Sequence, residues 1–144
     1  MQQSSGSTNR GGSAIILSVA RILIVDDDEA VTGTYVRMLQ AAGHEASTAG
    51  DAGRGLEQLR ARRPDAMLLD MRMAGRTGLE FLRQLRADPA HCELPVGIVT
   101  GDYFVGQDVL AEIATLNATI RYKQIWFDDM SALVEGLLHH DSPS

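Results

Sequence analysis

Apolar residues fall into two patterns that alternate along the chain. Short apolar runs bounded by polar or glycine residues predict five strands, at 21–25, 45–49, 66–69, 95–99 and 118–122. Between them, apolar residues three and four positions apart predict five helices, at 28–42, 51–62, 77–87, 106–116 and 128–138. Strands that alternate with helices are typical of a parallel sheet covered by helices.

The apolar character of the strands predicts their place in the sheet. The runs ILIV, AMLL and VGIV are continuously apolar, as strands buried on both faces should be. The run EASTA is far more polar, which fits an edge strand. Five strand–helix repeats are too few for an eight-stranded barrel, so the fold class predicted is α/β, an open doubly wound parallel sheet with five helices on both faces.

Local signals place several helix ends and loop residues. Thr77 followed by Glu80 forms a capping box, Asp28 is expected to cap the first helix, and Gly43 is expected to end it. The four histidines lie in predicted loops or in the tail, and we expect them all to be exposed to solvent: His44, His91, His139 and His140.

Composition indicates one folded domain with polar ends. Residues 1–13 are almost entirely Ser, Gly, Gln, Asn and Thr, and such a composition cannot form a core. The prediction is a flexible leader or a remnant of cloning at 1–20, one domain at 21–140 and a short tail at 141–144. The apolar stretch 14–20 is too short to span a bilayer.

Charge and cysteine content narrow the possible partners. The chain carries 19 acidic and 13 basic residues, a net charge of −6, and an acidic surface repels nucleic acid and anionic lipid. We therefore expect neither as a partner. The single cysteine, Cys92, cannot form an internal disulfide, which suits the cytoplasm.

Chemistry-bearing side chains gather where predicted strands end. Asp26 and Asp27 follow the first strand, Asp70 the third, Thr100 the fourth and Lys123 the fifth. Parallel strands bring their carboxyl ends to one edge of the sheet, where open α/β folds bind ligands. Converging carboxylates repel one another, and a bound cation relieves that repulsion. Because the donors are all oxygen, the sequence predicts Mg²⁺ rather than zinc.

These side chains suit phosphoryl chemistry. A carboxylate such as Asp70 can attack phosphorus, while Thr100 can donate a hydrogen bond and Lys123 can place a compact positive charge near the phosphoryl oxygens. Lys123 is the only lysine beside twelve arginines. The structural alternatives are helix or loop caps for the aspartates, a buried hydroxyl for Thr100 and a surface lysine for Lys123.

Four segments together resemble the response-regulator receiver domain of two-component signalling: ILIVDDDEA, PDAMLLDMRMAGRTGLEFLRQLR, LPVGIVTGDY and RYKQ, within 21–138. The resemblance implies the flavodoxin-like strand order 2-1-3-4-5. It implies site roles for six residues: phospho-acceptor for Asp70, direct Mg²⁺ ligand for Asp27, largely water-mediated ligand for Asp26, backbone-carbonyl ligand for Arg72, switch hydroxyl for Thr100 and phosphate contact for Lys123.

The resemblance also implies how such a domain works. The phosphoryl donor would be a sensor histidine kinase or a histidine phosphotransfer protein. The phosphorylated domain would pass the signal to a downstream output protein. Such a domain is not a conventional enzyme, although it autophosphorylates and slowly hydrolyses its aspartyl phosphate. Arg72 and Asp102 lie two residues past Asp70 and Thr100, and we hypothesise that this oppositely charged pair shields the acyl phosphate from water.

Three positions depart from the family pattern. Ala74 and Gln124 stand where prolines are usual, and Ile120 stands where the switch aromatic is usual. A non-proline residue makes a cis bond after Lys123 costly, by about 2.5–4 kcal/mol.

Features of the sequence also suggest three other functions. The first, motivated by Gln124 and Ile120, is a degenerate receiver-like module that binds proteins without phosphorylation. The second is a phosphatase with an aspartyl nucleophile, but Arg72 stands where its second acid is expected. The third is dinucleotide binding by Gly50, Gly53 and Gly55, whose order is G-x-x-G-x-G rather than G-x-G-x-x-G.

Overall fold

A computed structural model describes residues 19–73, 76–101, 104–123 and 127–139. Its main sheet has five parallel strands in the order β2-β1-β3-β6-β7. Their bounds are Arg21–Val25 for β1, Glu45–Ala49 for β2, Ala66–Leu69 for β3, Val96–Thr100 for β6 and Ala118–Tyr122 for β7. The predicted 2-1-3-4-5 order and the edge position of EASTA are therefore confirmed.

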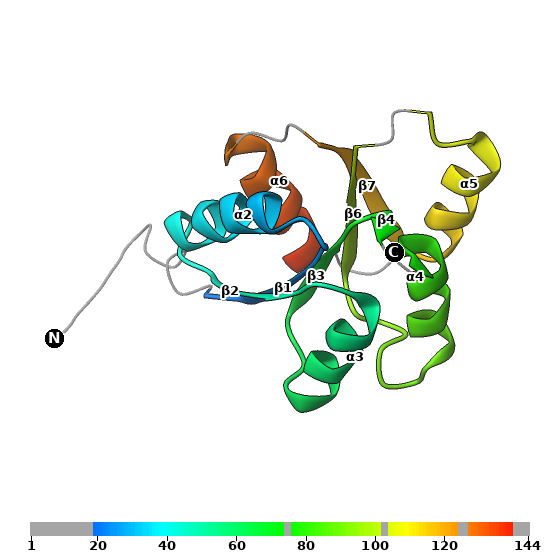
Figure 1. The fold of residues 1–144 in the computed structure, drawn as a ribbon, viewed down its shortest axis with the longest axis horizontal. Coiled ribbons are helices and arrows are strands. Elements are labelled where there is room, and N and C mark those ends of the chain that lie inside the picture. The colour runs from blue at the N-terminus through cyan, green and yellow to red at the C-terminus, as the bar shows by residue number, and fades with distance from the viewer. Residues whose placement is uncertain (1–18, 74–75, 102–103, 124–126, 140–144) are drawn as a thin grey trace, which may run out of the picture.

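Five helices cover the two faces of this sheet (Figure 1). One face carries α2 (Glu29–Ala41) and α6 (Phe127–Leu138), whose apolar residues share a buried cluster with Ile22, Ile24 and Leu68. The other face carries α3 (Ala52–Ala61), α4 (Gly78–Ala87) and α5 (Gln107–Thr115), packed on Leu23, Val25 and Leu69. This confirms the predicted doubly wound α/β class.

Helix ends follow the local signals in the sequence. The Asp28 side chain accepts hydrogen bonds from the backbone N–H groups of Ala30 and Val31, and Thr77 and Glu80 form the predicted capping box. Gly43 ends the α2 region with a φ of +91°, a left-handed conformation that favours glycine. The sequence did not predict a short antiparallel hairpin, β4 (Arg72–Met73) and β5 (Arg76–Thr77), between β3 and α4.

Charged side chains of α4 hold α5 in place. Only Ile113 of α5 is buried, and its N-cap residue, Gly106, offers no side chain. Arg83 donates two hydrogen bonds to the Glu112 carboxylate, of 2.6 and 2.7 Å. The half-buried Arg86 guanidinium donates to the carbonyls of Leu116 and Asn117 at the end of α5. This helix is therefore attached both by these charged donors and by Ile113, Val109 and Leu116, which pack against the core.

The expectation that all histidines are exposed is wrong for two of them. His44 is 8% exposed, and its Nδ1 accepts a hydrogen bond of 3.2 Å from the backbone N–H of Ala20. His91 is 4% exposed, with its Nδ1 3.2 Å from the Asp88 carboxylate. Both lie in loops, but these loops fold back against the ends of strands and helices. His139 is exposed as expected, and His140 lies outside the described residues.

Replacing His44 tests this buried contact. His44→Leu leaves the Ala20 N–H without its acceptor, and an unsatisfied buried donor costs about 1–3 kcal/mol. We expect the free energy of unfolding in urea to fall by that amount. The control His139→Leu, at an exposed site, should change it by less than about 0.5 kcal/mol. Equal stability of the two variants would contradict a structural role for His44.

The ends of the chain lie outside the described residues. Neither the leader predicted at 1–20, of which only Val19 and Ala20 are described, nor the tail predicted at 141–144 is tested. Within the described residues, every helix is too short or too polar to cross a lipid bilayer.

Candidate functional site

The carboxyl ends of β1 and β3 bring three aspartates together. Carboxylate oxygens of Asp26, Asp27 and Asp70 lie within 4.8 Å of one another. Sheet hydrogen bonding carries on past both strands, because Asp26 N–H donates to the Ala49 carbonyl and Asp70 N–H donates to the Val25 carbonyl. Backbone pairing thus fixes where the aspartates stand, as the strand-end argument predicted.

Three successive aspartates take different positions. Asp26 is buried, and its Oδ1 accepts a hydrogen bond of 2.9 Å from the Asp28 N–H, which orients the carboxylate. Asp27 is exposed at the edge of the cluster. Asp28 turns to the helix instead and caps α2. Helix capping therefore belongs to Asp28, as predicted, and leaves Asp26 and Asp27 facing Asp70.

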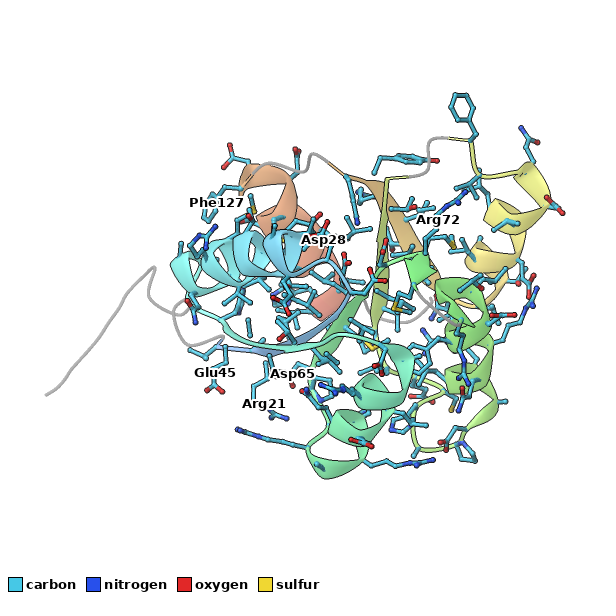
Figure 2. The ribbon with its side chains drawn as sticks, viewed as in Figure 1. Arg21, Asp28, Glu45, Asp65, Arg72 and Phe127 are labelled. Atoms are coloured by element: carbon cyan, nitrogen blue, oxygen red, sulfur yellow. The ribbon has the colours of Figure 1, made fainter. Side chains whose placement is uncertain are left out.

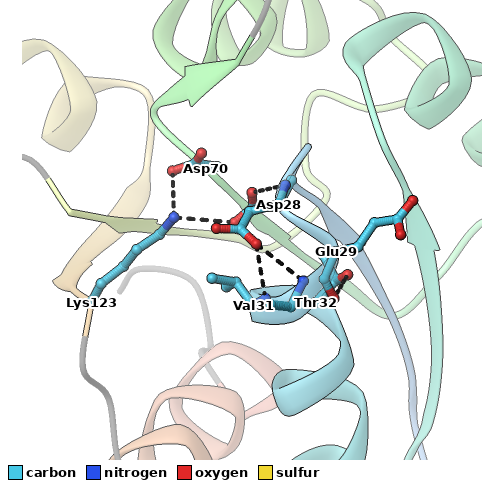
Figure 3. Close-up of polar contacts among 8 residues, drawn as sticks. Asp28, Glu29, Val31, Thr32, Asp70 and Lys123 are labelled. Atoms are coloured by element: carbon cyan, nitrogen blue, oxygen red, sulfur yellow. Dashed lines mark hydrogen bonds and ion pairs between the residues drawn. The ribbon is translucent and has the colours of Figure 1, made fainter.

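Lys123 reaches into this acidic cluster from the end of β7. Its Nζ lies 3.3 Å from Oδ2 of Asp26 and 3.5 Å from Oδ1 of Asp70. Figure 3 shows the Lys123 side chain directed at Asp70. Its backbone N–H donates to the Thr100 carbonyl at 2.7 Å, which joins the ends of β6 and β7. The alternative of an ordinary surface lysine is therefore wrong.

An open pocket lies over Asp70. Its volume is about 320 Å³, and its walls are Asp70, Arg72, Thr100, Gly101 and Lys123. Thr100 is completely buried as a residue, whereas Arg72 belongs to the exposed rim. Figure 2 shows Asp28 and Arg72 at this edge of the sheet, opposite Arg21, Glu45 and Asp65 at the amino ends of the strands. Four of the six predicted site residues, Asp70, Arg72, Thr100 and Lys123, contribute to one surface, with Asp26 and Asp27 beside it.

Burial and charge set the protonation of this cluster. Burial raises the pKa of Asp70, and the nearby Asp26 carboxylate raises it further, while Lys123 and the backbone N–H of Arg72 act in the opposite direction. Burial opposes the charged form of Lys123, but the Asp70 and Asp26 carboxylates outweigh it and raise the pKa of the ammonium. Burial, together with the same two carboxylates, raises the pKa of the Tyr35 phenol to about 12. The two buried carboxylates therefore disfavour each other's charged form, and Lys123 offsets part of this repulsion.

The donor set fits a hard divalent cation. Asp26, Asp27 and Asp70 offer oxygens only, and Mg²⁺ prefers carboxylate oxygens and keeps several waters. Two of the three carboxylates are buried, so a cation here would offset a repulsion that solvent screens poorly. This arrangement supports the Mg²⁺ expectation on chemical grounds.

Sequence reasoning missed Gly78, the first residue of α4. A Cβ atom at this position would lie 2.3 Å from the carbonyl oxygen of Asp70 and 2.9 Å from the Cα of Met71. The Gly78 N–H also donates to the Met71 carbonyl at 2.7 Å. Gly78 therefore lets α4 start directly against the backbone of Asp70. The sequence offers one sign of this role, because Gly78 directly follows Thr77, the first residue of the capping box.

The departures from the family pattern are only partly described. Ile120 is half-buried and packs against the core cluster beneath α4 and α5, so this position is filled by an aliphatic side chain. Ala74 and Gln124 lie outside the described residues, as does the peptide bond that joins Lys123 to Gln124.

Comparison with known proteins agrees with this fold. The response regulator receiver domain model matches residues 22–120, more than half of the chain. The chain therefore belongs to the response regulator receiver domain family of two-component systems.

Relatives and solved structures give the same picture. Protein PilH of Pseudomonas aeruginosa is 39% identical over 82 residues, which cover 57% of this chain and 68% of PilH. Response regulator MprA of Mycobacterium avium is 32% identical over 123 residues, covering 85% of this chain and 53% of MprA, so the chain spans about half of that relative.

Among solved structures, the N-terminal domain of a receiver protein from Methanoculleus marisnigri matches with a TM-score of 0.70 and 28% identity, covering 86% of this chain and all of that one. CheY4 of Vibrio cholerae matches with a TM-score of 0.76 at 24% identity, covering 84% and 100%, which shows the shared fold.

Proposed function

We propose that this receiver domain accepts a phosphoryl group on Asp70 from the phosphohistidine of a sensor histidine kinase or histidine phosphotransfer protein. One observation carries the proposal: the Asp70 carboxylate lines an open pocket together with Thr100 and Lys123, with the Lys123 ammonium 3.5 Å away. A nucleophile, a hydroxyl donor and a cation thus surround space that a phosphoryl group can enter.

The transfer is a displacement at phosphorus. An Asp70 oxygen forms the new P–O bond, the P–N bond of the donor breaks, and its electron pair returns to the imidazole nitrogen. Lys123 contacts one phosphoryl oxygen as a point charge, and the Thr100 hydroxyl donates a hydrogen bond to another. Asp26, largely through water, Asp27, Asp70 and the backbone carbonyl of Arg72 would hold Mg²⁺, which would neutralise charge on the phosphoryl oxygens.

The phosphorylated domain acts as a switch rather than as an enzyme with turnover. The aspartyl phosphate is hydrolysed slowly, and its presence changes the binding of a downstream output protein. The acidic charge of −6 argues against nucleic acid or an anionic membrane as direct partners. With its single cysteine, the chain suits the cytoplasm.

Intact-mass measurement after incubation with acetyl phosphate and Mg²⁺ tests the proposal. We expect wild type to gain one phosphoryl group and Asp70→Asn to gain none, because an amide is not the required nucleophile. Asp28→Asn, which alters only the helix cap, is the matched control and should be phosphorylated. Wild type that remains unmodified by either acetyl phosphate or a phosphohistidine donor would favour the degenerate binding module instead.

Arg72 is expected to prolong the life of the aspartyl phosphate. Its side chain stands at the rim of the pocket, across which water must approach, and its hypothesised partner Asp102 lies outside the described residues. Since an exposed ion pair is worth about 0.2–1 kcal/mol, Arg72→Ala should speed loss of radiolabelled phosphate only a few-fold. Arg76→Ala is the control, and decay of Arg72→Ala at the wild-type rate would remove this arginine from the mechanism.

A further inference from the structure

Two adjoining hollows lie at the amino ends of the strands, far from the phosphorylation site. The first, of about 310 Å³, is lined by Val19, Ala20, Asp65, Pro95, Leu138 and His139. The second, of about 460 Å³, shares Pro95 and includes Gly136 and Leu137 at the end of α6. We call the two together the Pro95 hollow. Figure 2 shows Asp65 at this end of the sheet.

Apolar surface is left uncovered in the Pro95 hollow. Val19 is 59% exposed, and Leu138 is only partly buried. A Cβ atom at Gly136 would meet nothing within 4 Å, so there is space beside the last turns of α6. Adjoining hollows with exposed aliphatic groups mark a place where further apolar atoms can bind.

The sequence contains an apolar segment beside this surface. Residues 14–17 read Ala-Ile-Ile-Leu, follow a polar stretch and lie outside the described residues. The chain is held where it enters the fold, because Ala20 donates to His44 and accepts from Glu45. Val19 and Ala20 themselves line the hollow. At about 3.3–3.6 Å per residue, residues 15–17 lie within about 14 Å of Val19 along the chain, which is within reach of the hollow that Val19 lines.

We propose that residues 14–17 pack into the Pro95 hollow of their own chain. The driving force is removal of Ile15, Ile16 and Leu17 from water against Pro95, Val19 and Leu138. A tether of only a few residues gives the segment a millimolar effective concentration, which favours its own hollow over that of a second copy. Asp65 and His139 stay at the rim, where they remain in contact with solvent.

A disulfide trap tests this placement in the full chain. In a Cys92→Ser background, Leu17→Cys with Leu138→Cys should form a bridge within the monomer under mild oxidation at high dilution. A bridge requires Cβ atoms within about 3.5–4.5 Å, so docking must bring the two positions into contact. Leu17→Cys with Glu112→Cys, on the far helix α5, is the control pair.

Each outcome of the trap is decisive. A predominant bridge within one chain, well above the control pair, supports the proposal. A bridge that forms only between chains means that the segment covers a second copy, and bridging no greater than in the control means that it does not dock. Either result overturns the proposal.

Stability supplies a second, independent readout. The pair Ile15→Ser and Leu17→Ser should lower the equilibrium constant for folding by at least about tenfold, because two aliphatic side chains that are partly buried in an open hollow are lost. The pair Ser4→Ala and Ser5→Ala in the polar stretch should leave it unchanged. Equal urea midpoints for the two double variants would also overturn the proposal, whatever the state of phosphorylation.

Discussion

Gly78→Ala is expected to destabilise the protein by about 3 kcal/mol and to slow phosphorylation of Asp70. The added methyl would lie 2.3 Å from the Asp70 carbonyl oxygen, an overlap with backbone that no rotamer change relieves. Overpacking typically costs 1–3 kcal/mol, and a backbone clash belongs at the upper end. Moving the acceptor by about 1 Å can cost about a hundredfold in rate.

Urea unfolding and the rate of phosphorylation by acetyl phosphate measure the two effects of Gly78→Ala. The matched control is Gly136→Ala, in α6, where a Cβ meets nothing within 4 Å. We expect this control to be stabilising by about 0.4–1 kcal/mol, because alanine restricts the unfolded chain. If both substitutions had the same effect, the close approach of α4 to the acceptor would not be the reason for Gly78.

Lys123→Met is expected to lower the free energy of unfolding by about 1–3 kcal/mol in metal-free buffer at neutral pH. The substitution leaves the Asp26 and Asp70 carboxylates, only 3% and 7% exposed, without the cation between them. Breaking a buried ion pair costs about 3–5 kcal/mol, and we reduce this because Lys123 is 23% exposed.

The loss of stability in Lys123→Met should depend on pH. The raised pKa of Asp70 means that the folded protein holds this proton more tightly than the unfolded chain. The stability that Asp70 contributes by binding this proton is fully present below its ordinary pKa of 3.8. It is lost as pH rises through the pKa of Asp70 in the folded protein. The deficit of Lys123→Met should therefore shrink in acid. The pKa of Lys123 is raised, so its contribution to stability is fully present below its ordinary pKa of 10.5 and is lost as pH rises through its pKa in the folded protein. The difference between wild type and Lys123→Met should therefore shrink in strong alkali too.

Urea unfolding across this pH range measures the effect. Arg121→Met removes an exposed cation from the same strand and should change stability by less than about 0.5 kcal/mol. Adding Asp70→Asn to Lys123→Met should restore stability, because it removes one of the two facing charges. A deficit independent of pH, or no rescue by Asp70→Asn, would mean that Lys123 stabilises the fold through its aliphatic stem alone.

The strand-end aspartates, Thr100 and Lys123 could be placed from the sequence because the arrangement depends on topology alone. Continuous apolar runs identify the central parallel strands, and parallel strands bring the residues that follow them to one edge. The alternation of apolar spacing also located the helices to within a residue or two at each end, as at the capping box of Thr77. The positions of Asp26, Asp70 and Lys123 follow from these two regularities.

Other features depend on contacts between distant segments, which periodicity does not encode. His44 is buried because the loop after α2 meets the start of β1, and its residue type gives no sign of this contact. Gly78 is required by the backbone of Asp70, eight positions earlier in the sequence. The hairpin of β4 and β5 joins two-residue strands, too short for an alternating pattern. Such positions can be recognised only from the tertiary structure.

The attachment of α5 by Arg83 and Arg86 has a consequence for local opening of the protein. Charge-assisted contacts at the surface weaken as ionic strength rises, whereas the burial of the sheet and of α4 does not. With Ile113 as its only fully buried residue, α5 is expected at the low-stability end of the molecule, and its amide hydrogens should exchange with solvent before those of β6. We therefore expect α5 to unfold and refold locally while β6, which ends at Thr100, stays intact.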